Sequence, residues 1–493
     1  MEHIPQRSAE PDSPTATAQR AAAPDVTAKS RTKSEDSPLP AGAKSVPRAP
    51  GRLPLLGHAL PLARSPLGFV SALRDTADLV RVDIATLPVY FVNSFDLAHD
   101  VMVAQATSFE KGRFFDRLRS LVGNGLATAD AQTHRVHRRL MQPLFHRDRI
   151  AAYAELMALH AGGITESWTP GMTVAVDDVM NEFVVTTVAA SMFSSDIGAP
   201  ARECVQRNMP VIIKNLLLRT VSPEFLDRVP IPANRRFDTA TRELHEVLDE
   251  VIAAARTAGA GYAPDVPDVL STLLEARDAD TGEPLSDTEV RDELGTILFA
   301  GAEATASTLA WVFHEIARRP EIEEQLVAEI TRVVGDGPVT FQHVRQLPLM
   351  QRVLDETVRL HGVTLLMRRA VKPVTLGGYL LSPGTEVAFS LYALHRDPRA
   401  YPDPERFDPD RWLPENAPDR RAVFMPFGAG NRKCIGDAFA WTAIIIALAT
   451  ILPRWQLRHV PGRLPKEATS AVPHPDRLPM TVLRRDVPAV KPS

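Results

Sequence analysis

The strongest candidate for chemistry in this chain is Cys434, which lies in the segment MPFGAGNRKCIG at residues 425–436. An apolar stretch with the pattern of a helix follows the cysteine, and Arg432 and Lys433 precede it. A helix N-terminus and neighbouring cations both favour a thiolate over a thiol, and the thiolate is the form that binds metals. Backbone amides in such a loop can also donate hydrogen bonds to the sulfur. Three glycines permit positive φ and close backbone approach, which a loop wrapped against a flat ligand requires: Gly428, Gly430 and Gly436.

The other cysteine, Cys204, has no such setting, and a lone cysteine is usually an inert core residue. Two cysteines in 493 residues do not form a disulfide framework, which indicates a reducing compartment such as the cytoplasm. Charged residues make up 24% of the chain and the net charge is −4, so nucleic acid is not an expected partner. We also expect no membrane span, because no stretch approaches the ~20 consecutive apolar residues that a span needs.

The cysteine segment resembles the cysteine-ligand loop of the cytochrome P-450 family, which reads Phe-x-x-Gly-x-Arg-x-Cys-x-Gly. Five positions match within ten residues: Phe427, Gly430, Arg432, Cys434 and Gly436. The resemblance implies a haem b cofactor whose iron is held by Cys434, with Phe427 next to the haem. It extends over about residues 47–485, nearly all of the chain that is expected to fold.

Haem carries two propionates, which need cationic or hydrogen-bonding partners. His134 and Arg138 lie one helical turn apart and match the family's His-x-x-x-Arg pattern, so both can reach one carboxylate. Arg368 and Arg432 match two further propionate positions of the family. The resemblance therefore implies four haem-binding side chains in addition to the cysteine.

Other cations near these positions have two interpretations. Arg135 and Arg139 form either a solvated basic face or, together with Lys433, a docking surface for an acidic electron carrier. The chain contains no obvious flavin or ferredoxin domain, so the resemblance implies a separate donor, a small ferredoxin with its reductase. We expect the protein itself to be a monomer.

A second charged pattern is formed by Glu356 and Arg359, which lie at i and i+3 on a predicted helix over residues 351–360. A bare Glu-x-x-Arg pair is usually a surface salt bridge. Here Pro404-Glu405-Arg406-Phe407 follows before the cysteine loop, and the resemblance implies that Arg406 joins the pair in one buried network. A buried network with every charge paired fixes geometry more surely than it adds stability, so we expect it to lock the layer under the haem.

The long central helix of the family carries an Ala/Gly-Gly-x-Asp/Glu-Thr pattern, whose acid and alcohol deliver protons to dioxygen. Ala300, Gly301 and Glu303 match this pattern, but Ala304 stands in place of the alcohol. Thr305 follows, turned by about 100° around the helix. We expect Glu303 and Thr305 to be the catalytic groups, with Thr305, a water molecule or a substrate hydroxyl replacing the missing alcohol.

The pattern of elements indicates a mainly α fold with small β-sheets. A Ser-x-x-Glu capping box at Ser286 begins the central helix, and Pro320 ends it, a length of roughly 50 Å. A second helix is predicted over 435–452, strands over 79–85 and 89–93, and a hairpin at Pro383-Gly384 that pairs residues 374–381 with 386–390. Residues 48–493 are then one catalytic domain of the cytochrome P-450 fold, with the haem between the central helix and the cysteine loop. Residues 1–47, rich in Pro, Ala and Ser, are expected to be disordered.

The resemblance implies a haem-thiolate monooxygenase that inserts one oxygen atom from dioxygen into an apolar small molecule. Residues 53–58 and 232–238 look like those of bacterial terpene hydroxylases, so a terpene or similar natural product is the expected substrate. The chain lacks the proline that many relatives have after the position of His361, so we expect the pocket wall to differ there. The presumed pocket residues are apolar: Phe299, Val363, Leu365, Leu366 and Val472.

Two alternatives stay open at this point. The first is a peroxide-driven or redox-neutral haem-thiolate enzyme, whose case the missing alcohol at Ala304 strengthens. The second is a haem-binding sensor without turnover.

Overall fold

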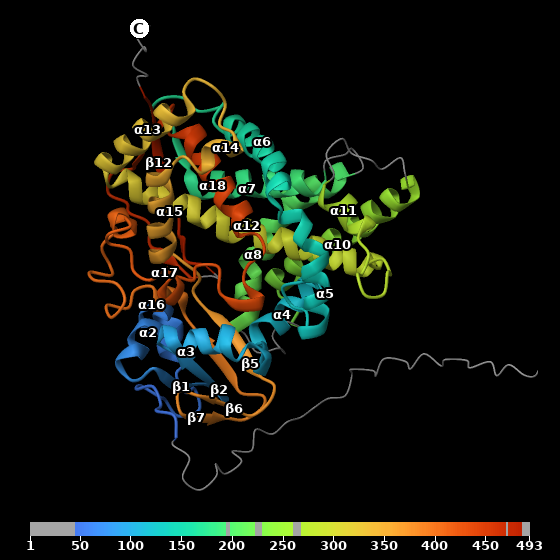
Figure 1. Cartoon of the computed structure of the whole chain (residues 1–493), viewed down its shortest axis with the longest axis vertical. Helices are drawn as coiled ribbons and strands as arrows, with labels where there is room; N and C mark the ends of the chain where they lie inside the picture. Colours follow the sequence, from blue (N-terminus) through green and yellow to red (C-terminus); the bar gives the residue numbers. More distant parts are fainter. Residues whose placement is uncertain (1–44, 194–197, 222–228, 260–267, 470–471, 486–493) are drawn as a thin grey trace, which may run out of the picture. The chain divides into compact units, whose positions relative to one another are not determined.

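The computed structural model describes residues 45–193, 198–221, 229–259, 268–469 and 472–485. Residues 44–493 form one compact unit (Figure 1). The predicted disordered tail, residues 1–47, lies almost entirely outside the described residues. The Pro47 carbonyl accepts a hydrogen bond of 2.8 Å from the N–H of Arg81, so the chain is already paired with a strand at that point.

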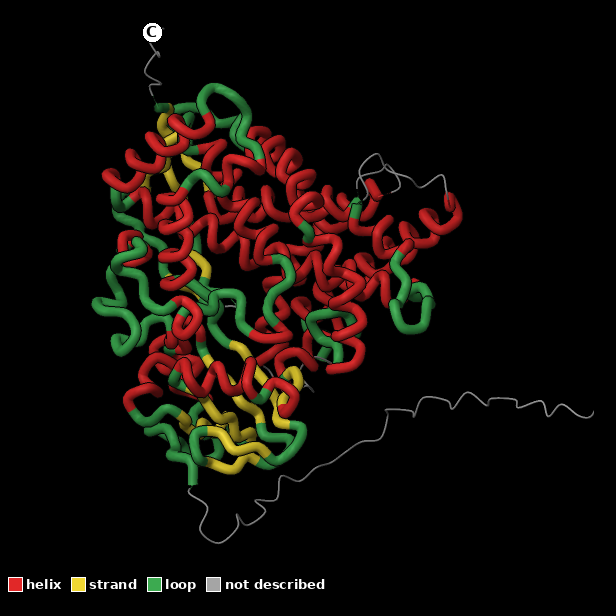
Figure 2. The backbone as a smooth tube through the Cα atoms, in the orientation of Figure 1, coloured by secondary structure: helices red, strands yellow, loops and turns green. Residues whose placement is uncertain are grey.

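Helices make up most of the unit and strands lie in small groups, as Figure 2 shows, which agrees with the predicted mainly α class. In Figure 1, β1, β2, β5, β6 and β7 lie together at the lower end, and α6, α7, α12 and α18 lie above them. The helices are α1 Ala59–Arg64, α2 Pro66–Ala72, α3 Phe95–His99, α4 Arg113–Val122, α5 Ala131–Met141, α6 Arg147–Gly163, α7 Val176–Met192, α8 Ala199–Val221, α10 Pro232–Ala258, α11 Val269–Glu275, α12 Asp287–Ala317, α13 Pro320–Val334, α14 Phe341–Val344, α15 Pro348–Leu360, α16 Leu391–Leu394, α17 Arg420–Val423 and α18 Asp437–Ile451.

Helix α12 is the predicted central helix, and its start has the predicted capping box. The Ser286 side chain accepts from the N–H of Glu289, and the Glu289 carboxylate accepts from the N–H of Ser286. The helix contacts α7, α10, α15 and α18, so it passes through the middle of the helical region. The expectation that no segment has the length and hydropathy of a membrane span is wrong for α12. However, 67% of its apolar window is buried inside the fold, as in a core helix.

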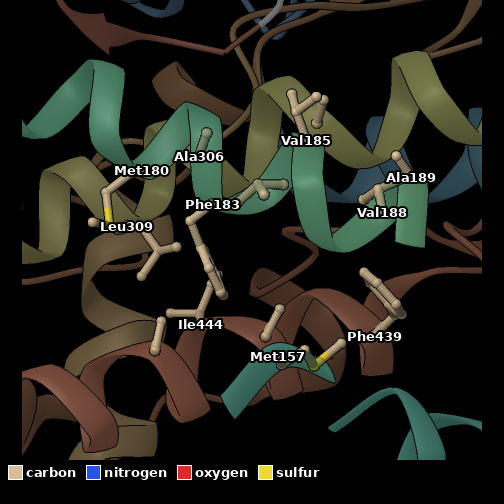
Figure 3. Close-up of a cluster of buried hydrophobic side chains, with 14 of the residues drawn as sticks. Met157, Met180, Phe183, Val185, Val188, Ala189, Ala306, Leu309, Phe439 and Ile444 are labelled. Atoms are coloured by element: carbon tan, nitrogen blue, oxygen red, sulfur yellow. The ribbon is translucent and has the colours of Figure 1, made fainter. Parts of the chain in front are cut away.

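The largest apolar core lies where α12 meets its neighbours. Figure 3 shows Phe183 of α7 between Leu309 of α12 and Ile444 of α18. Gly301 allows α7 to approach closely, because an added Cβ would lie 3.3 Å from Cγ2 of Val188. This packing fixes α12 relative to α18, the helix that follows the cysteine loop.

The largest sheet has the order β1-β2-β8-β5-β3, in which β2 and β8 are parallel and the other neighbours are antiparallel. Its short edge strand β3 brings Lys111 directly opposite Arg368 of β5. The strands are β1 Leu79–Ile84, β2 Leu87–Val92, β3 Phe109–Lys111, β4 Thr173–Ala175, β5 Leu366–Ala370, β6 Val374–Leu376, β7 Tyr379–Leu381, β8 Glu386–Phe389, β9 Trp455–His459, β10 Glu467–Ala468, β11 His474–Pro475 and β12 Pro479–Arg484.

The predicted hairpin at Pro383-Gly384 is wrong in its pairing. A turn does occur there, with Gly384 at a φ of 84° and the Thr385 N–H donating to the Ser382 carbonyl at 3.2 Å. However, β7 pairs back onto β6 across Gly377 and Gly378, whereas β8 pairs with β2 and β5 in the larger sheet. The Pro-Gly turn therefore joins two sheets, because β8 finds better partners far away in the sequence than next to it.

Candidate cofactor site and active site

The cysteine loop is held in a closed form by its own backbone. The N–H of Cys434 donates to the carbonyl of Phe427 at 3.0 Å, and the Phe427 ring packs edge-on against Trp441 of α18 with ring centroids 5.1 Å apart. Gly428 and Gly430 have the predicted positive φ, at 72° and 69°. A Cβ on Gly430 would lie 2.1 Å from the carbonyl oxygen of Met102, so only glycine fits there. Gly436, in contrast, has a φ of −92°, so its role is not a left-handed backbone.

The thiol of Cys434 is not activated in the way that the sequence suggested. Burial raises its pKa, although the N–H of Gly436 donates to it and the cations of Arg138 and Lys433 lower the pKa. Asp437 also opposes these cations, and Lys433 pairs with it at 2.6 Å. Lys433 favours the thiolate, as predicted, and so do Arg138 and the N–H of Gly436, but burial of the thiol outweighs all three. A metal ion, which binds the deprotonated form, is the partner that would favour the thiolate.

Solvent accessibility gives a second view of Cys434. The residue is exposed, although protein atoms surround its thiol closely enough for burial to raise the pKa. The two observations agree, because a thiol at a partly open surface is reached by water and still loses much of its hydration.

Two cations face each other across the edge of the larger sheet. Lys111 and Arg368 are directly opposed in the antiparallel pairing of β3 with β5, which places their side chains on the same face. Burial lowers the pKa of Lys111 well below its usual value, and Arg368 and Arg432 lower it further, while Cys434 raises it. Burial, with the charge of Arg432, lowers the pKa of Arg368 to about 10. Among the described residues, Lys111 has no acidic hydrogen-bond partner; its ammonium lies 4.0 Å from the ring centroid of Phe115.

The predicted cations of α5 and of the cysteine loop complete this group. Burial lowers the pKa of His134 to about 3, and Arg432, Lys111 and Arg138 lower it too, so its imidazole is neutral. The Arg432 guanidinium donates to the Ala129 carbonyl at 2.9 Å, and Arg138 donates to the Lys433 carbonyl. These two bonds join the cysteine loop to α5. The structure thus brings together all four predicted propionate-binding residues and adds Lys111.

Buried cations beside a cysteine thiol suit a flat ligand that carries two negative charges and a metal ion for the thiolate. Like charges that are buried together are unfavourable unless an anion compensates them. The acids that raise the pKa of Arg432 in the described residues are Asp130 and Glu110. Haem b presents two carboxylates at one edge and an iron atom at its centre. Lys111, Arg368 and Arg432 are electrostatically coupled to one another and Lys111 to Cys434, so the residues present fit haem b.

The middle of α12 contains an open stretch within an otherwise buried helix. Ala300 is exposed and Ala304, one turn later, is half-buried, whereas Ala302 and Ala306 are buried. Glu303 is half-buried and lies beside this open face. Thr305 is only 4% exposed and faces the core. The structure therefore places Glu303 next to the opening and does not place Thr305 there.

The buried network under the cysteine loop has a different third member from the predicted one. The Glu356 carboxylate accepts from Arg359 at 2.8 and 2.9 Å, and both side chains are fully buried. Arg406 is wrong as the third arginine, because its side chain is 70% exposed and only its carbonyl accepts from Arg359, at 3.1 Å. Arg411, which is 9% exposed, takes this place with its Nε 3.4 Å from Oε1 of Glu356. Trp412 completes the set by donating its indole N–H to Glu356 at 2.9 Å.

This network reaches the cysteine loop through a histidine. Arg359 donates to the carbonyl of His395 at 2.9 Å, and the N–H of Met425 donates to Nε2 of His395 at 3.2 Å. Met425 is the first residue of the cysteine segment. Hydrogen bonds thus connect the network to the loop that carries Cys434, the layer that it was predicted to lock.

Four of the predicted pocket residues pack against the apolar clusters of the fold. These four are half-buried and Val472 is buried. Val363 and Leu366 pack on the cluster around the sheet, and Phe299 packs on the large helical core. Apolar side chains with an accessible part are available here to line a cavity.

Sequence reasoning missed Lys111 and Arg411. The signal for Arg411 was present, since Asp-Arg-Trp follows Glu-Arg-Phe within a few residues and has the same pattern. The signal for Lys111 was weaker: its strand has three residues, and its partner in β5 is 257 positions away. Such a pairing cannot be read from local patterns.

Comparisons with known proteins agree with this site. Residues 47–479 match the family model described as Cytochrome P450. The chain is 38% identical to a Cyclooctat-9-en-7-ol 5-monooxygenase of Streptomyces melanosporofaciens over 84% of this chain and 90% of the relative. It is 34% identical to a Pentalenene oxygenase of Streptomyces avermitilis over 89% of this chain and 97% of the relative. A crystal structure of the cytochrome P450DA heme domain superposes with a TM-score of 0.79 and 28% identity, over 90% of this chain and 99% of that chain.

Proposed function

The chain belongs to the cytochrome P450 family of haem-dependent monooxygenases, and from this premise we propose that it oxidises a terpene or a similar apolar natural product. The observation that carries the proposal is the group of buried cations around Lys111 and Arg368, which faces Cys434 and fits the propionates of haem b. The named activities of the two Streptomyces relatives support the substrate class.

In this proposal Cys434 would hold the haem iron through its thiolate. The haem, held through a thiolate, supplies the activation of dioxygen. Phe427 would pack beside the haem, and its contact with Trp441 holds its ring in place. The propionates are bound by the cations that the structure brings together: Lys111, His134, Arg138, Arg368 and Arg432.

Proton delivery is proposed to start from the Glu303 carboxylate, which lies beside the open face of α12. Thr305 was the other expected catalytic group, but its 4% exposure favours a different source for the missing hydroxyl. The Thr308 hydroxyl does not supply it, because it donates to the Ala304 carbonyl at 2.8 Å. A water molecule or a hydroxyl of the substrate is therefore the proposed bridge at Ala304.

The electron donor is proposed to be a small acidic ferredoxin with its reductase. Arg135 and Arg139 are exposed on α5, close to the cysteine loop that α5 contacts through Arg138. Arg139 is only weakly held, with 3.4 Å to Asp280, so it is free to meet an acidic partner. A monomer in the cytoplasm is consistent with a donor that arrives by diffusion.

The substrate class can be tested with a binding-spectrum titration of pentalenene and cyclooctat-9-en-7-ol, the molecules named for the relatives. A saturable shift of the haem absorption band with either molecule is expected. Val363→Asp, which puts a charge on the proposed wall, should abolish the shift and keep the haem. Val371→Asp, on an exposed valine just after β5, is the matched control and should leave the shift unchanged. No shift with either terpene would refute the substrate class.

A second candidate, peroxide-driven oxidation, is favoured by one observation, the absence of a hydroxyl at Ala304. Turnover of the same terpene with hydrogen peroxide alone, at a rate equal to that with ferredoxin, reductase and NADPH, would support it. We expect turnover to require the electron donors.

A further inference from the structure

His361 sits between two carboxylates at the end of α15. Its Nε2 lies 3.0 Å from Oε1 of Glu315 on α12, and its Nδ1 lies 2.7 Å from Oε1 of Glu467 on β10. Each ring nitrogen is therefore within hydrogen-bond distance of a carboxylate oxygen, so the ring is held from both sides. The side chain of His361 is 8% exposed, and these bonds are therefore shielded from water.

The ring of His361 is also stacked on Trp311 of α12. The two ring centroids are 4.1 Å apart and the planes differ by 7°. Stacking of two flat rings buries both faces and fixes their relative orientation. The indole N–H of Trp311 donates to the carbonyl of Pro473 at 2.8 Å. The imidazole of the stacked pair therefore binds Glu467, and the indole binds Pro473.

The charges around this pair support the same arrangement. Burial raises the pKa of Glu315, but its bond to His361 and the cation of Arg319 outweigh burial and bring the pKa to about 2. Glu467 has a lowered pKa for the same kind of reason: His361, Arg396 and the Tyr392 hydroxyl act against burial. On the far side of the stacked pair, burial lowers the pKa of His314 to about 4, and His459 bonds to it at 2.9 Å.

The stacked pair joins the two proposed walls of the substrate pocket. His361 lies two residues before the wall segment 363–366. Tyr392 connects the same elements: its hydroxyl donates to Glu467 at 2.8 Å, and its N–H donates to the Val363 carbonyl at 3.0 Å. The other wall residue, Val472, is adjacent to Pro473. We propose that His361, stacked on Trp311 and bonded to Glu315 and Glu467, is a positioning residue that sets the distance between the two walls and so the fit of the substrate.

This inference rests on the proposed function, because that function places Val363 and Val472 beside the substrate. It also accounts for the missing proline after His361. A histidine with two acidic partners, followed by Gly362, replaces the rigid turn with a hydrogen-bonded one. An added Cβ at Gly362 would lie 2.3 Å from the Val358 carbonyl oxygen, so the turn leaves no room for a side chain there.

Two azoles test the positioning role without knowledge of the natural substrate. Imidazole binds the haem iron without needing the walls, whereas the phenyl group of 4-phenylimidazole must fit between them. We expect His361→Phe and Trp311→Phe to raise the dissociation constant of 4-phenylimidazole about three- to tenfold. The dissociation constant of imidazole should stay within about twofold of the wild-type value in both variants. His245→Gln, which removes a histidine bond to the Leu121 carbonyl from a half-buried site on α10, is the matched control and should change neither value.

The results distinguish failure of the positioning role from failure of the proposed pocket wall. If His361→Phe does not bind haem, Trp311→Phe decides, since it keeps a ring on His361 and loses only the bond to Pro473. An unchanged ratio of the two dissociation constants in Trp311→Phe, or an equal loss for both azoles, would overturn the positioning role. Val363→Ala tests the premise: an unchanged ratio in that variant would mean that the proposed wall is wrong, whatever the result for Trp311.

Discussion

Replacing Lys111 with methionine should have opposite effects on the haem-free and the haem-bound protein. Without haem, the ammonium of Lys111 is opposed across the sheet by Arg368 and is further repelled by Arg432. Methionine has a similar length and no charge, so Lys111→Met relieves this repulsion. With haem bound, the same change removes one partner of a propionate.

The size of each effect follows from the surroundings of the side chain. Replacing a buried charge by an apolar group of similar volume stabilises proteins by about 1–4 kcal/mol. Lys111 retains some exposure, so we expect the lower part of that range, about 1–2 kcal/mol, for the haem-free protein. A charge-assisted hydrogen bond contributes about 1.5–3 kcal/mol, which corresponds to a roughly 10- to 100-fold loss of haem affinity.

Both effects can be measured without any substrate. Urea unfolding of the haem-free protein gives the stability, and transfer of haem to an excess of apomyoglobin gives its rate of loss. The matched control is Lys372→Met, which removes an exposed lysine two residues after β5 and should change neither quantity. If Lys111→Met destabilises the haem-free protein, or retains haem as long as the wild type, then Lys111 does not belong to the cation group and the reasoning is refuted.

Three other variants test the rest of the site. The reduced protein with carbon monoxide should absorb near about 450 nm; Cys434→Ser should lose this band and Cys204→Ser should keep it, and the opposite result would reassign the ligand. Glu356→Ala should yield insoluble or haem-free protein, because it strands buried arginines at a cost of about 3–5 kcal/mol, whereas Arg406→Ala should incorporate haem normally. Burial, together with nearby arginines, lowers the pKa of His395 to about 3, so the unfolded chain binds its proton from pH ~6.5 downward and the folded chain does not. The free energy of unfolding should therefore fall by about 2 kcal/mol less between pH 7.5 and 5 in His395→Asn than in the wild type, and equal slopes would contradict the assignment.

The sequence was sufficient to locate the cysteine loop, because that loop is built from local contacts. The carbonyl of Phe427 and the N–H of Cys434, which close the loop, are seven residues apart, and Gly428 and Gly430 adopt their positive φ within it. The capping box of α12 is equally local, and it too was predicted correctly. Where a feature depends on neighbours within one or two turns, the order of residues contains the information.

Features that depend on long-range contacts were predicted less well. The hairpin at Pro383-Gly384 failed because β8 pairs in parallel with β2, nearly 300 residues earlier in the chain. Arg406 and Arg411 have similar sequence surroundings, and only the packing of Trp412 onto Glu356 decides which arginine turns inward. The raised pKa of the Cys434 thiol was missed for a related reason, since burial comes from elements that are remote in sequence.

These long-range features give the site a common physical property: without the cofactor, its buried cations repel one another and its thiol is uncharged. The cations come from a sheet edge, from α5 and from the cysteine loop, and each lowers the proton affinity of the others. The thiol likewise prefers its neutral form until a metal binds it. A dianion that carries a cationic metal compensates both imbalances at once, so binding of the cofactor and folding of these three elements should be coupled. The fully paired Glu356 network then has the complementary role, because it holds the loop of Cys434 in position whether or not those charges are compensated.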